Sequence, residues 1–291
     1  MATAQFRAWR RFCRNRGALV GAFLVSMVLA MAVLAPLLSA HDPLSPDFDS
    51  GLTELGAPVE PNFEYPLGTD RLGRSVWSRL VHGAEVSLVV GFSAVLIAVT
   101  FGVLIGLVAG YAGGMVDTLL MRLVDMVLAF PFLLLAILLA ALLRESAVGD
   151  GTAKVFITLG VVGWTTMARV VRGKVLTLRE MDFIESARCV GASTARILFR
   201  HLLPNVLGPI AVLATLGMAQ MILAESVLSY LSLGPPPPTP SWGRMLYEGQ
   251  TYYRTAPWLI AAPGVAILIT VIGFNLLGEG LRDVFDPKDH H

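Results

Sequence analysis

Six long runs of apolar residues, each free of charged side chains, dominate the hydrophobic pattern of the chain. They cover residues 17–40, 86–116, 126–143, 155–168, 202–224 and 255–278. About 20 apolar residues in a helix are needed to cross a hydrocarbon core of ~30 Å, and a helix satisfies its own backbone in lipid. The run at 155–168 is short, and reaches spanning length if Arg169 and Arg172 extend to the interface. The pattern predicts an all-α, polytopic membrane protein with six transmembrane helices.

Composition agrees with a chain that lives in lipid. Of the 291 residues, 55% are hydrophobic and only 15% are charged, whereas soluble domains average roughly 25% charged residues. The formal net charge of +1 argues against a nucleic-acid binder that works through bulk charge. The high apolar fraction excludes a disordered chain.

The charged residues that are present are distributed by side of the membrane. Residues 1–16 carry five arginines and no acid, whereas residues 41–70 carry seven acids and no lysine or arginine. The positive-inside rule therefore predicts a cytoplasmic N-terminus and an extracytoplasmic 41–70 segment. Six spans then return the C-terminus to the cytoplasm. The basic segment between the fourth and fifth runs falls on the same inner side.

This topology divides the chain into five regions. They are a cytoplasmic basic tail (1–16), a first transmembrane helix (17–40), an extracytoplasmic loop (41–85), a permease core of five transmembrane helices (86–281) and a cytoplasmic tail (282–291). Arg71, Arg74 and Arg79 fall on the predicted outer side, beside Trp77 and Leu80. We expect an interfacial helix there.

The inner segment between the fourth and fifth runs, about 179–204, predicts a helical elbow. Residues 179–190 are rich in helix formers, and Gly191 is well placed just past a helix end. Ser193 is a suitable cap for a second short helix, and Pro204 marks the boundary with the fifth run. Such an elbow suits docking of a partner protein. A helical loop that lies on anionic lipid headgroups is the alternative.

The elbow resembles the EAA loop of ABC importer permeases. The matching residues are Glu185, Ala187, Gly191, Leu203 and Pro204, with Ser186 in place of the middle alanine and His201 where isoleucine is usual. Further blocks, at 66–74, 129–131, 223–246 and 274–287, are similar to the C-type subunit of the oligopeptide/dipeptide branch. The resemblance covers nearly the whole chain.

This resemblance implies a type I ABC importer permease fold and a subunit of a peptide importer in the bacterial plasma (inner) membrane. It implies a homologous B-type permease subunit, two ATP-binding subunits or domains, an extracytoplasmic substrate-binding protein and a peptide substrate. Glu185, Ser186, Ala187, Gly191, Leu203 and Pro204 would couple the permease to the ATPases. No G-x-x-x-x-G-K-[S/T] loop is found, so we expect no enzyme activity and no cofactor in this chain, with ATP and Mg on the partner ATPases.

Glu225 and Asp125 are acids within or at the ends of the predicted spans, and we expect them at the pathway or gate. A contact with the partner subunit is the alternative for Glu225. Gly102, Gly106 and Gly110 form a stripe that predicts close helix packing, and Pro131 predicts a kink. No metal site is expected. An ion-coupled secondary transporter, a membrane scaffold, and a permease for another small solute, such as a nickel complex, stay as alternative functions.

Overall fold

The structure is a computed structural model that describes residues 12–146 and 149–285. Expectations for residues 1–11 and 286–291, including parts of both tails, lie outside this range. The described residues form helices joined by loops. Their only β pairing consists of two isolated bridges, Leu52 with Pro58 and Thr69 with Ser75. The prediction of an all-α fold is therefore confirmed.

Five helices in the described ranges are long and apolar enough to cross a bilayer. They are α2 (Arg16–Val33), α4 (Val76–Ala112), α7 (Gly151–Leu178), Thr194–Tyr230, which ends in α10 (Leu203–Tyr230), and α12 (Trp258–Phe285). The pair α5 (Gly114–Leu128) and α6 (Phe132–Leu143) makes a sixth if it counts as one span, although it is bent by 87°. The remaining short helices are α3 (Ala35–Leu38), α8 (Asp182–Cys189), α9 (Thr194–Arg196), α11 (Trp242–Gly249), the π-helix Ile197–Leu202 and the 3-10 helix Gln250–Tyr252.

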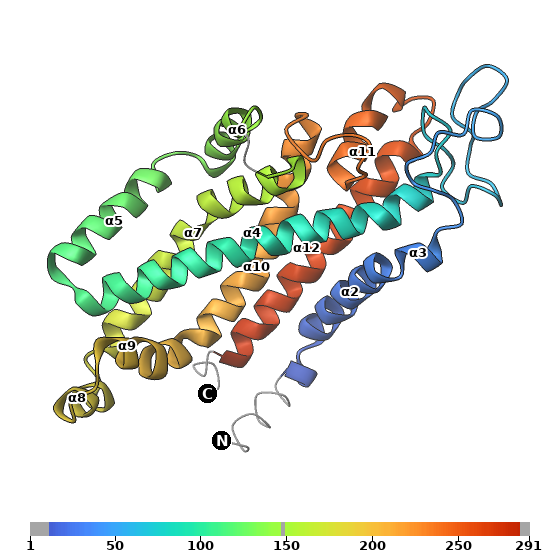
Figure 1. The fold of residues 1–291 in the computed structure, drawn as a ribbon. Coiled ribbons are helices and arrows are strands. Elements are labelled where there is room, and N and C mark those ends of the chain that lie inside the picture. Colours follow the sequence, from blue (N-terminus) through green and yellow to red (C-terminus); the bar gives the residue numbers. More distant parts are fainter. Residues whose placement is uncertain (1–11, 147–148, 286–291) are drawn as a thin grey trace.

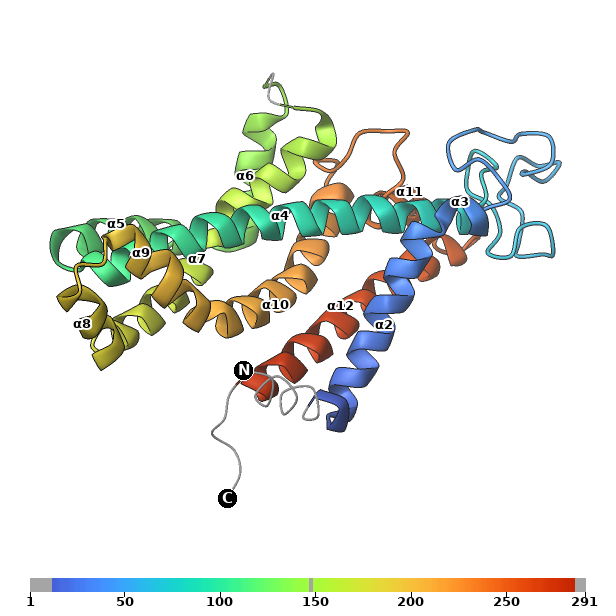
Figure 2. The same ribbon diagram turned by 60° about the horizontal axis from the view of Figure 1, so that its bottom comes forward.

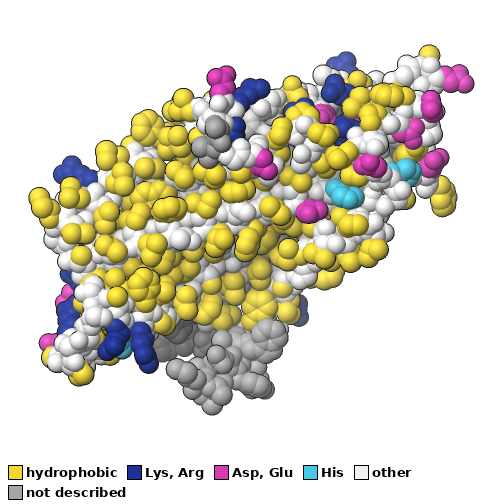
Figure 3. Space-filling model, viewed as in Figure 1, with side chains coloured by type: hydrophobic (Ala, Val, Ile, Leu, Met, Phe, Trp, Pro, Cys, Tyr) yellow, Lys and Arg dark blue, Asp and Glu magenta, His cyan; other side chains and the backbone are white. Residues whose placement is uncertain are grey.

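The long helices lie side by side, with α2 beside α12 and α4 crossing the molecule in front of α7 and α10 (Figures 1 and 2). The start of α2 and the end of α12 meet, because Asn15 Nδ2 donates to Asp283 Oδ2 at 2.7 Å. The elbow helix α8 projects at the same end of the molecule as these two helix ends, and the 41–75 loop lies at the opposite end. Acidic side chains gather at the loop end of the face seen in Figure 3, and hydrophobic side chains cover its middle.

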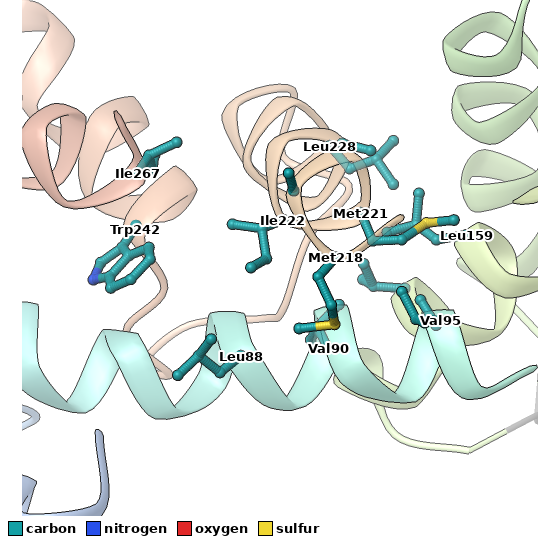
Figure 4. Packing of buried hydrophobic residues seen from close by; sticks show 14 of the residues in the cluster. Leu88, Val90, Val95, Leu159, Met218, Met221, Ile222, Leu228, Trp242 and Ile267 are labelled. Atoms are coloured by element: carbon teal, nitrogen blue, oxygen red, sulfur yellow. The ribbon is translucent and has the colours of Figure 1, made fainter. Parts of the chain in front are cut away.

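The main core lies between α4, α7, α10, α11 and α12, with further buried residues from α2 and α6. Trp242 is fully buried, and its indole Nε1 donates to the Leu80 carbonyl at 3.0 Å. Ile222, Met218 and Leu88 fill the space between α4 and α10 (Figure 4). The short helix α11 is thus packed on the bundle by a large buried side chain.

The glycine stripe packs α4 against α7. A Cβ at Gly102 would lie 2.7 Å from the Trp164 carbonyl oxygen, and one at Gly106 would lie 2.7 Å from that of Ala168. At Gly110 a Cβ would come within 2.8 Å of Val175. The prediction of close helix packing is confirmed, because any larger residue would force the two backbones apart.

The segment around Trp77 and Leu80, where we expect an interfacial helix, is helical, but it is the start of the long helix α4 and not a separate helix. Val76 begins α4, ten residues before the predicted apolar run, and continues without a break to Ala112. Arg74 and Arg79 are only 5% and 2% exposed, because they pair with carboxylates of the same chain. Charged residues near the start of α4 hid its true length from the apolar pattern.

The third predicted span is divided at Pro131. The proline has no N–H to donate into the preceding turn, and α5 ends at Leu128 while α6 begins at Phe132. The expected kink is thus a break of 87°. Gly113, with a φ of +66°, separates α5 from α4, and Gly114, with a φ of +54°, is the first residue of α5.

Candidate functional site

The elbow helix α8 ends in a Schellman motif centred on Gly191. The N–H of Gly191 donates to the Arg188 carbonyl at 2.9 Å, and that of Ala192 donates to the Ala187 carbonyl at 3.0 Å. Gly191 has a φ of +77°, and a Cβ there would meet nothing within 4 Å. Glycine is therefore required for its backbone conformation and not for space. Ser193 caps α9, as predicted, by accepting from the Arg196 N–H.

Side chains tie α8 to the membrane helices. Ile184 is fully buried in a cluster that includes Val171 and Val175 of α7. The Arg188 guanidinium lies over the Tyr111 ring of α4, 5.2 Å from its centroid, an arrangement that attracts the cation to the ring face. The elbow is thus held to two different spans.

The rest of α8 is open. Glu185 and Ser186 are exposed, Ala187 is half-buried, and Val190, just beyond the helix, is 89% exposed. Glu185 forms no ion pair among the residues that the structure describes. The elbow therefore presents an unpaired carboxylate, a small central residue and an apolar side chain to its surroundings.

Leu203 and Pro204 begin α10, as expected, immediately after a π-helical turn over Ile197–Leu202. Pro204 cannot donate a backbone hydrogen bond, and the Asn205 side chain donates to the His201 carbonyl at 2.6 Å. A π-type turn beside a proline is a usual site of helix distortion. The structure thus brings Glu185, Ser186, Ala187, Gly191, Leu203 and Pro204 to one end of the molecule.

A cavity of about 380 Å³ lies between the spans, at the break in α5–α6. Residues of α4, α7 and α10 line it together with Phe130, Pro131 and Phe132. Its polar side chains are Thr165 and Thr166 of α7 and Gln220 of α10, and most of the remaining lining is apolar. Phe130 is 59% exposed, so the cavity lies at a surface of the single chain. The sequence indicated this position only through Pro131, at which a kink was predicted.

Asp125 lies outside this cavity. Its carboxylate accepts from Arg169 Nη2 of α7 at 2.7 Å, and both side chains are more than half exposed. Nearer the start of α5, Asp117 accepts two hydrogen bonds from Arg172, which is also in α7. The two predicted interfacial arginines therefore hold the bent span against α7.

Glu225 lies inside the chain, roughly 33 Å along α10 from Leu203 at 1.5 Å per residue. Its side chain is 0% exposed. Ser87 Oγ of α4 donates to one carboxyl oxygen at 3.1 Å, and Ser229 Oγ donates to the other at 2.6 Å. Residues of α4, α10 and the start of α11 enclose this side chain, and its place at the gate or at a contact with a second subunit stays a prediction. It also lies outside the 380 Å³ cavity.

A buried ionic cluster, which the sequence pattern did not reveal, joins the 41–75 loop to α4 and α11. Arg79 Nη1 donates to Asp70 at 2.5 Å and to Glu248 at 2.7 Å, and Arg74 contacts the same two carboxylates. Burial acts to raise the pKa of Glu248, but the charges and hydrogen bonds of Arg79, with those of Arg244 and Arg74, outweigh it and lower that pKa. Asp70 and Arg74 are both in the 66–74 block, which was the available signal.

The fold, the elbow and the membrane cavity define a membrane-spanning transport subunit. Residues 102–289 match the family described as binding-protein-dependent transport system inner membrane component, and residues 6–58 match the N-terminal TM domain of oligopeptide transport permease C. The chain belongs to this family of ABC importer permeases, in its oligopeptide/dipeptide C-type branch. The resemblance found in the sequence is confirmed.

Curated relatives are similar over nearly the whole chain. The dipeptide transport system permease protein DppC of Alkalihalophilus pseudofirmus is 40% identical over 97% of this chain and 89% of its own length. The di/tripeptide permease DppC of Pseudomonas aeruginosa is 39% identical over 96% and 91%. The oligopeptide permease OppC of Bacillus subtilis is 38% identical over 97% and 88%.

The fold is also similar to that of a solved transporter. A chain of the inward-facing MetNI methionine ABC transporter superposes with a TM-score of 0.58 at 20% identity, over 72% of this chain and 97% of that chain. At this identity the likeness concerns the fold alone. The protein is a multi-pass inner membrane permease with the type I importer fold.

Proposed function

We propose that this chain forms half of the translocation pathway of an ATP-driven importer for dipeptides or oligopeptides. The observation that carries the proposal is its 38–40% identity, over 96–97% of the chain, to permeases named for dipeptide, di/tripeptide and oligopeptide transport. A homologous B-type permease chain would supply the other half. The exposed cavity at the α5–α6 break supports this arrangement, since a pathway between two chains needs an open side on each.

In this proposal, the elbow transmits movement from the partner ATPases to the cavity. The ATPases bind ATP and Mg, and their closure displaces α8 through the open surface around Glu185 and Val190. Because α8 is attached to α7 by Ile184 and to α4 by Arg188, and leads through the π-helical turn into α10, its displacement shifts three walls of the cavity. The pathway would then alternate between inward- and outward-facing forms.

The elbow end of the molecule lies in the cytoplasm in this proposal, with both chain termini, and the 41–75 loop faces outward. The excess of basic residues at the elbow and of acidic residues in the loop supports this orientation. A substrate-binding protein then delivers the peptide to the outer side.

The test is uptake by the complete reconstituted complex with its binding protein. We expect accumulation of a labelled dipeptide, such as alanyl-phenylalanine, that requires ATP inside the vesicles and is unchanged when a proton or sodium gradient is collapsed. Uptake driven by an ion gradient without the ATPases would contradict the proposal. A binding protein that retains only nickel complexes would contradict the peptide assignment and leave the importer mechanism intact.

A further inference from the structure

A second cavity, of about 470 Å³, lies where α6 turns back into α7. Its lining includes Arg144, Lys154 and Arg244, with residues 232–237 of the loop after α10. Because α10 begins at the elbow, its C-terminal end lies at the opposite end of the molecule, the end of the 41–75 loop. This cavity therefore belongs to the outer side of the permease in the orientation proposed above.

Three cations surround this cavity, and two of them lack a counter-charge. Neither Arg144 nor Lys154 takes part in an ion pair within residues 12–146 and 149–285. Lys154 Nζ donates to the Arg144 carbonyl at 3.0 Å, which holds the two residues together. Arg244 is bonded to Glu248 at 2.9 Å. The cavity is thus lined by positive charge and by no carboxylate.

The nearby acids do not neutralise these cations. Asp150 caps α7 by accepting from the Ala153 N–H at 2.6 Å. Glu145 is exposed, and it does not line the cavity. Of the two acids closest in sequence to Arg144 and Lys154, Asp150 therefore caps a helix and Glu145 is exposed to solvent.

Apart from Ser232, the remaining lining of the cavity is apolar. Val155 is 1% exposed and Ala140 is 7% exposed. The wall formed by Pro235–Pro237 has no backbone N–H groups, and a Cβ at Gly151 would overlap the Pro236 ring, so this wall touches α7 directly. Arg144, Lys154 and Arg244 therefore offer hydrogen-bond donors to an anionic ligand in the cavity. The apolar lining residues, which we call the apolar floor, offer it a surface without charge.

We propose that this cavity binds the C-terminal carboxylate of the incoming peptide, with the last side chain of the peptide on the apolar floor. The inference rests on the proposed function of peptide import. Every linear peptide carries this carboxylate whatever its sequence, so a cationic site recognises the class of substrate without restricting its side chains. Charge-assisted hydrogen bonds from arginine and lysine to a carboxylate are among the stronger polar contacts in proteins.

The same anion chemistry occurs in the phosphate of a lipid headgroup, and the experiment separates the two sources. The complete complex is reconstituted with wild-type permease or with Arg144→Gln/Lys154→Gln, using the same binding protein throughout. Initial ATP-driven uptake is measured for alanyl-phenylalanine and for its C-terminal amide. We expect the ratio of acid to amide uptake to fall about tenfold in the double variant, equivalent to ~1.4 kcal/mol.

Control variants set the limits of this effect. Arg254→Gln removes an exposed cation at the same end, stacked on Tyr253 and outside the cavity, and we expect it to keep the wild-type ratio. Arg144→Lys/Lys154→Arg retains both positive charges, so we expect its ratio of acid to amide uptake to stay close to that of the wild type. If the double variant does not assemble, the two single Gln variants provide the same test, each with a smaller fall in the ratio.

An unchanged acid-to-amide ratio would overturn the proposal, as would an equal fall for both substrates. The measurement is repeated in phosphatidylcholine vesicles with and without phosphatidylglycerol. If the variants lose only a stimulation by phosphatidylglycerol, equally for both substrates, the site binds lipid phosphate and the peptide assignment is wrong. Wild-type complex that transports neither peptide would overturn the proposed function itself, whereas wild-type transport with no effect of the variants would overturn only this inference.

Discussion

At the scale of single residues, the chain places buried charge where it joins separate segments. Asp70 and Arg74 come from the 41–75 loop, Arg79 from the first turn of α4 and Glu248 from α11. Arg79 is only 2% exposed, and its Nε has no hydrogen-bond partner within the described residues. Such a cluster stabilises one arrangement of the loop because removing one member leaves the others buried without compensation.

Glu248→Gln should destabilise the permease and flatten the dependence of its stability on pH. The pKa of Glu248 lies below its ordinary 4.5 in the folded chain. Its ionised form therefore stabilises the fold fully above pH 4.5, and this contribution is lost as the pH falls through the lower folded pKa. Breaking one partner of a buried pair costs about 3–5 kcal/mol. Thermal unfolding in detergent, measured from pH 7 down to pH values below 4.5, tests both effects.

Glu54→Gln is the matched control for this measurement, because Glu54 is an exposed acid of the 41–75 loop and lies outside the buried ionic cluster. We expect it to unfold as the wild-type permease does at every pH. Identical unfolding curves for Glu248→Gln and wild-type protein would show that the cluster does not stabilise the loop.

At the scale of elements, short helices and breaks decide how the spans are connected. The elbow helix α8 has only eight residues, too few to be stable alone in water. Ile184 and Arg188 stabilise it by contacts with α7 and α4. The bent pair α5–α6 is similarly held to α7 by the Arg169–Asp125 and Arg172–Asp117 ion pairs. Both elements take their positions from tertiary contacts.

Gly191→Val should uncouple ATP hydrolysis from transport while the complex still assembles. Valine at a φ of +77° is strained, and the strain would change the angle between α8 and α9. The contacts of Ile184 would keep α8 on the membrane domain. We expect at least about a tenfold loss of uptake per ATP hydrolysed, equivalent to ~1.4 kcal/mol, measured in proteoliposomes together with co-purification of the ATPases.

Gly173→Val is the control for the elbow variant. Gly173 also has open space around it, but it lies within α7 and has no positive φ. Normal coupling in Gly173→Val and loss in Gly191→Val would assign the effect to backbone conformation. Normal transport by Gly191→Val would contradict the coupling role of the elbow.

At the scale of the whole molecule, the two ends of the bundle differ in charge and in architecture. One end carries the elbow, together with the start of α2 and the end of α12. The other end carries the acidic loop, α11 and the cationic cavity. The 380 Å³ cavity lies between them, at the break in the α5–α6 span. In the proposed function, movement of the elbow reaches this cavity through α4, α7 and α10, which line it.

The proposed orientation predicts how thiols react in intact spheroplasts. Cys189 is exposed at the end of α8, so a membrane-impermeant maleimide should label it only after permeabilisation. Phe63 is fully exposed in the 41–75 loop. Phe63→Cys, in a variant with both native cysteines changed to alanine, should be labelled at once. The opposite pattern would invert the topology, and Cys13→Ala/Cys189→Ala alone controls for background labelling.

The sequence by itself determined the membrane class, the runs that become spans and the elbow. These features depend on local properties: the length of an apolar run, the positive φ that Gly191 supplies, and the missing N–H of Pro204 and Pro131. The sequence also predicted the close packing at the glycine stripe of α4, because glycines spaced by four residues lie on one face of a helix and let a neighbouring helix approach.

Only the tertiary structure decided the role of charged residues near the spans. The position of Glu225 in the sequence did not indicate that Ser87 and Ser229 bond its carboxyl group. Arg79 read as an interfacial residue, although its partner Glu248 lies 169 positions away in the sequence. The same holds for the cavity lined by Arg144 and Lys154. The cost of a charge depends on which groups surround it, and those neighbours come together only when the chain folds.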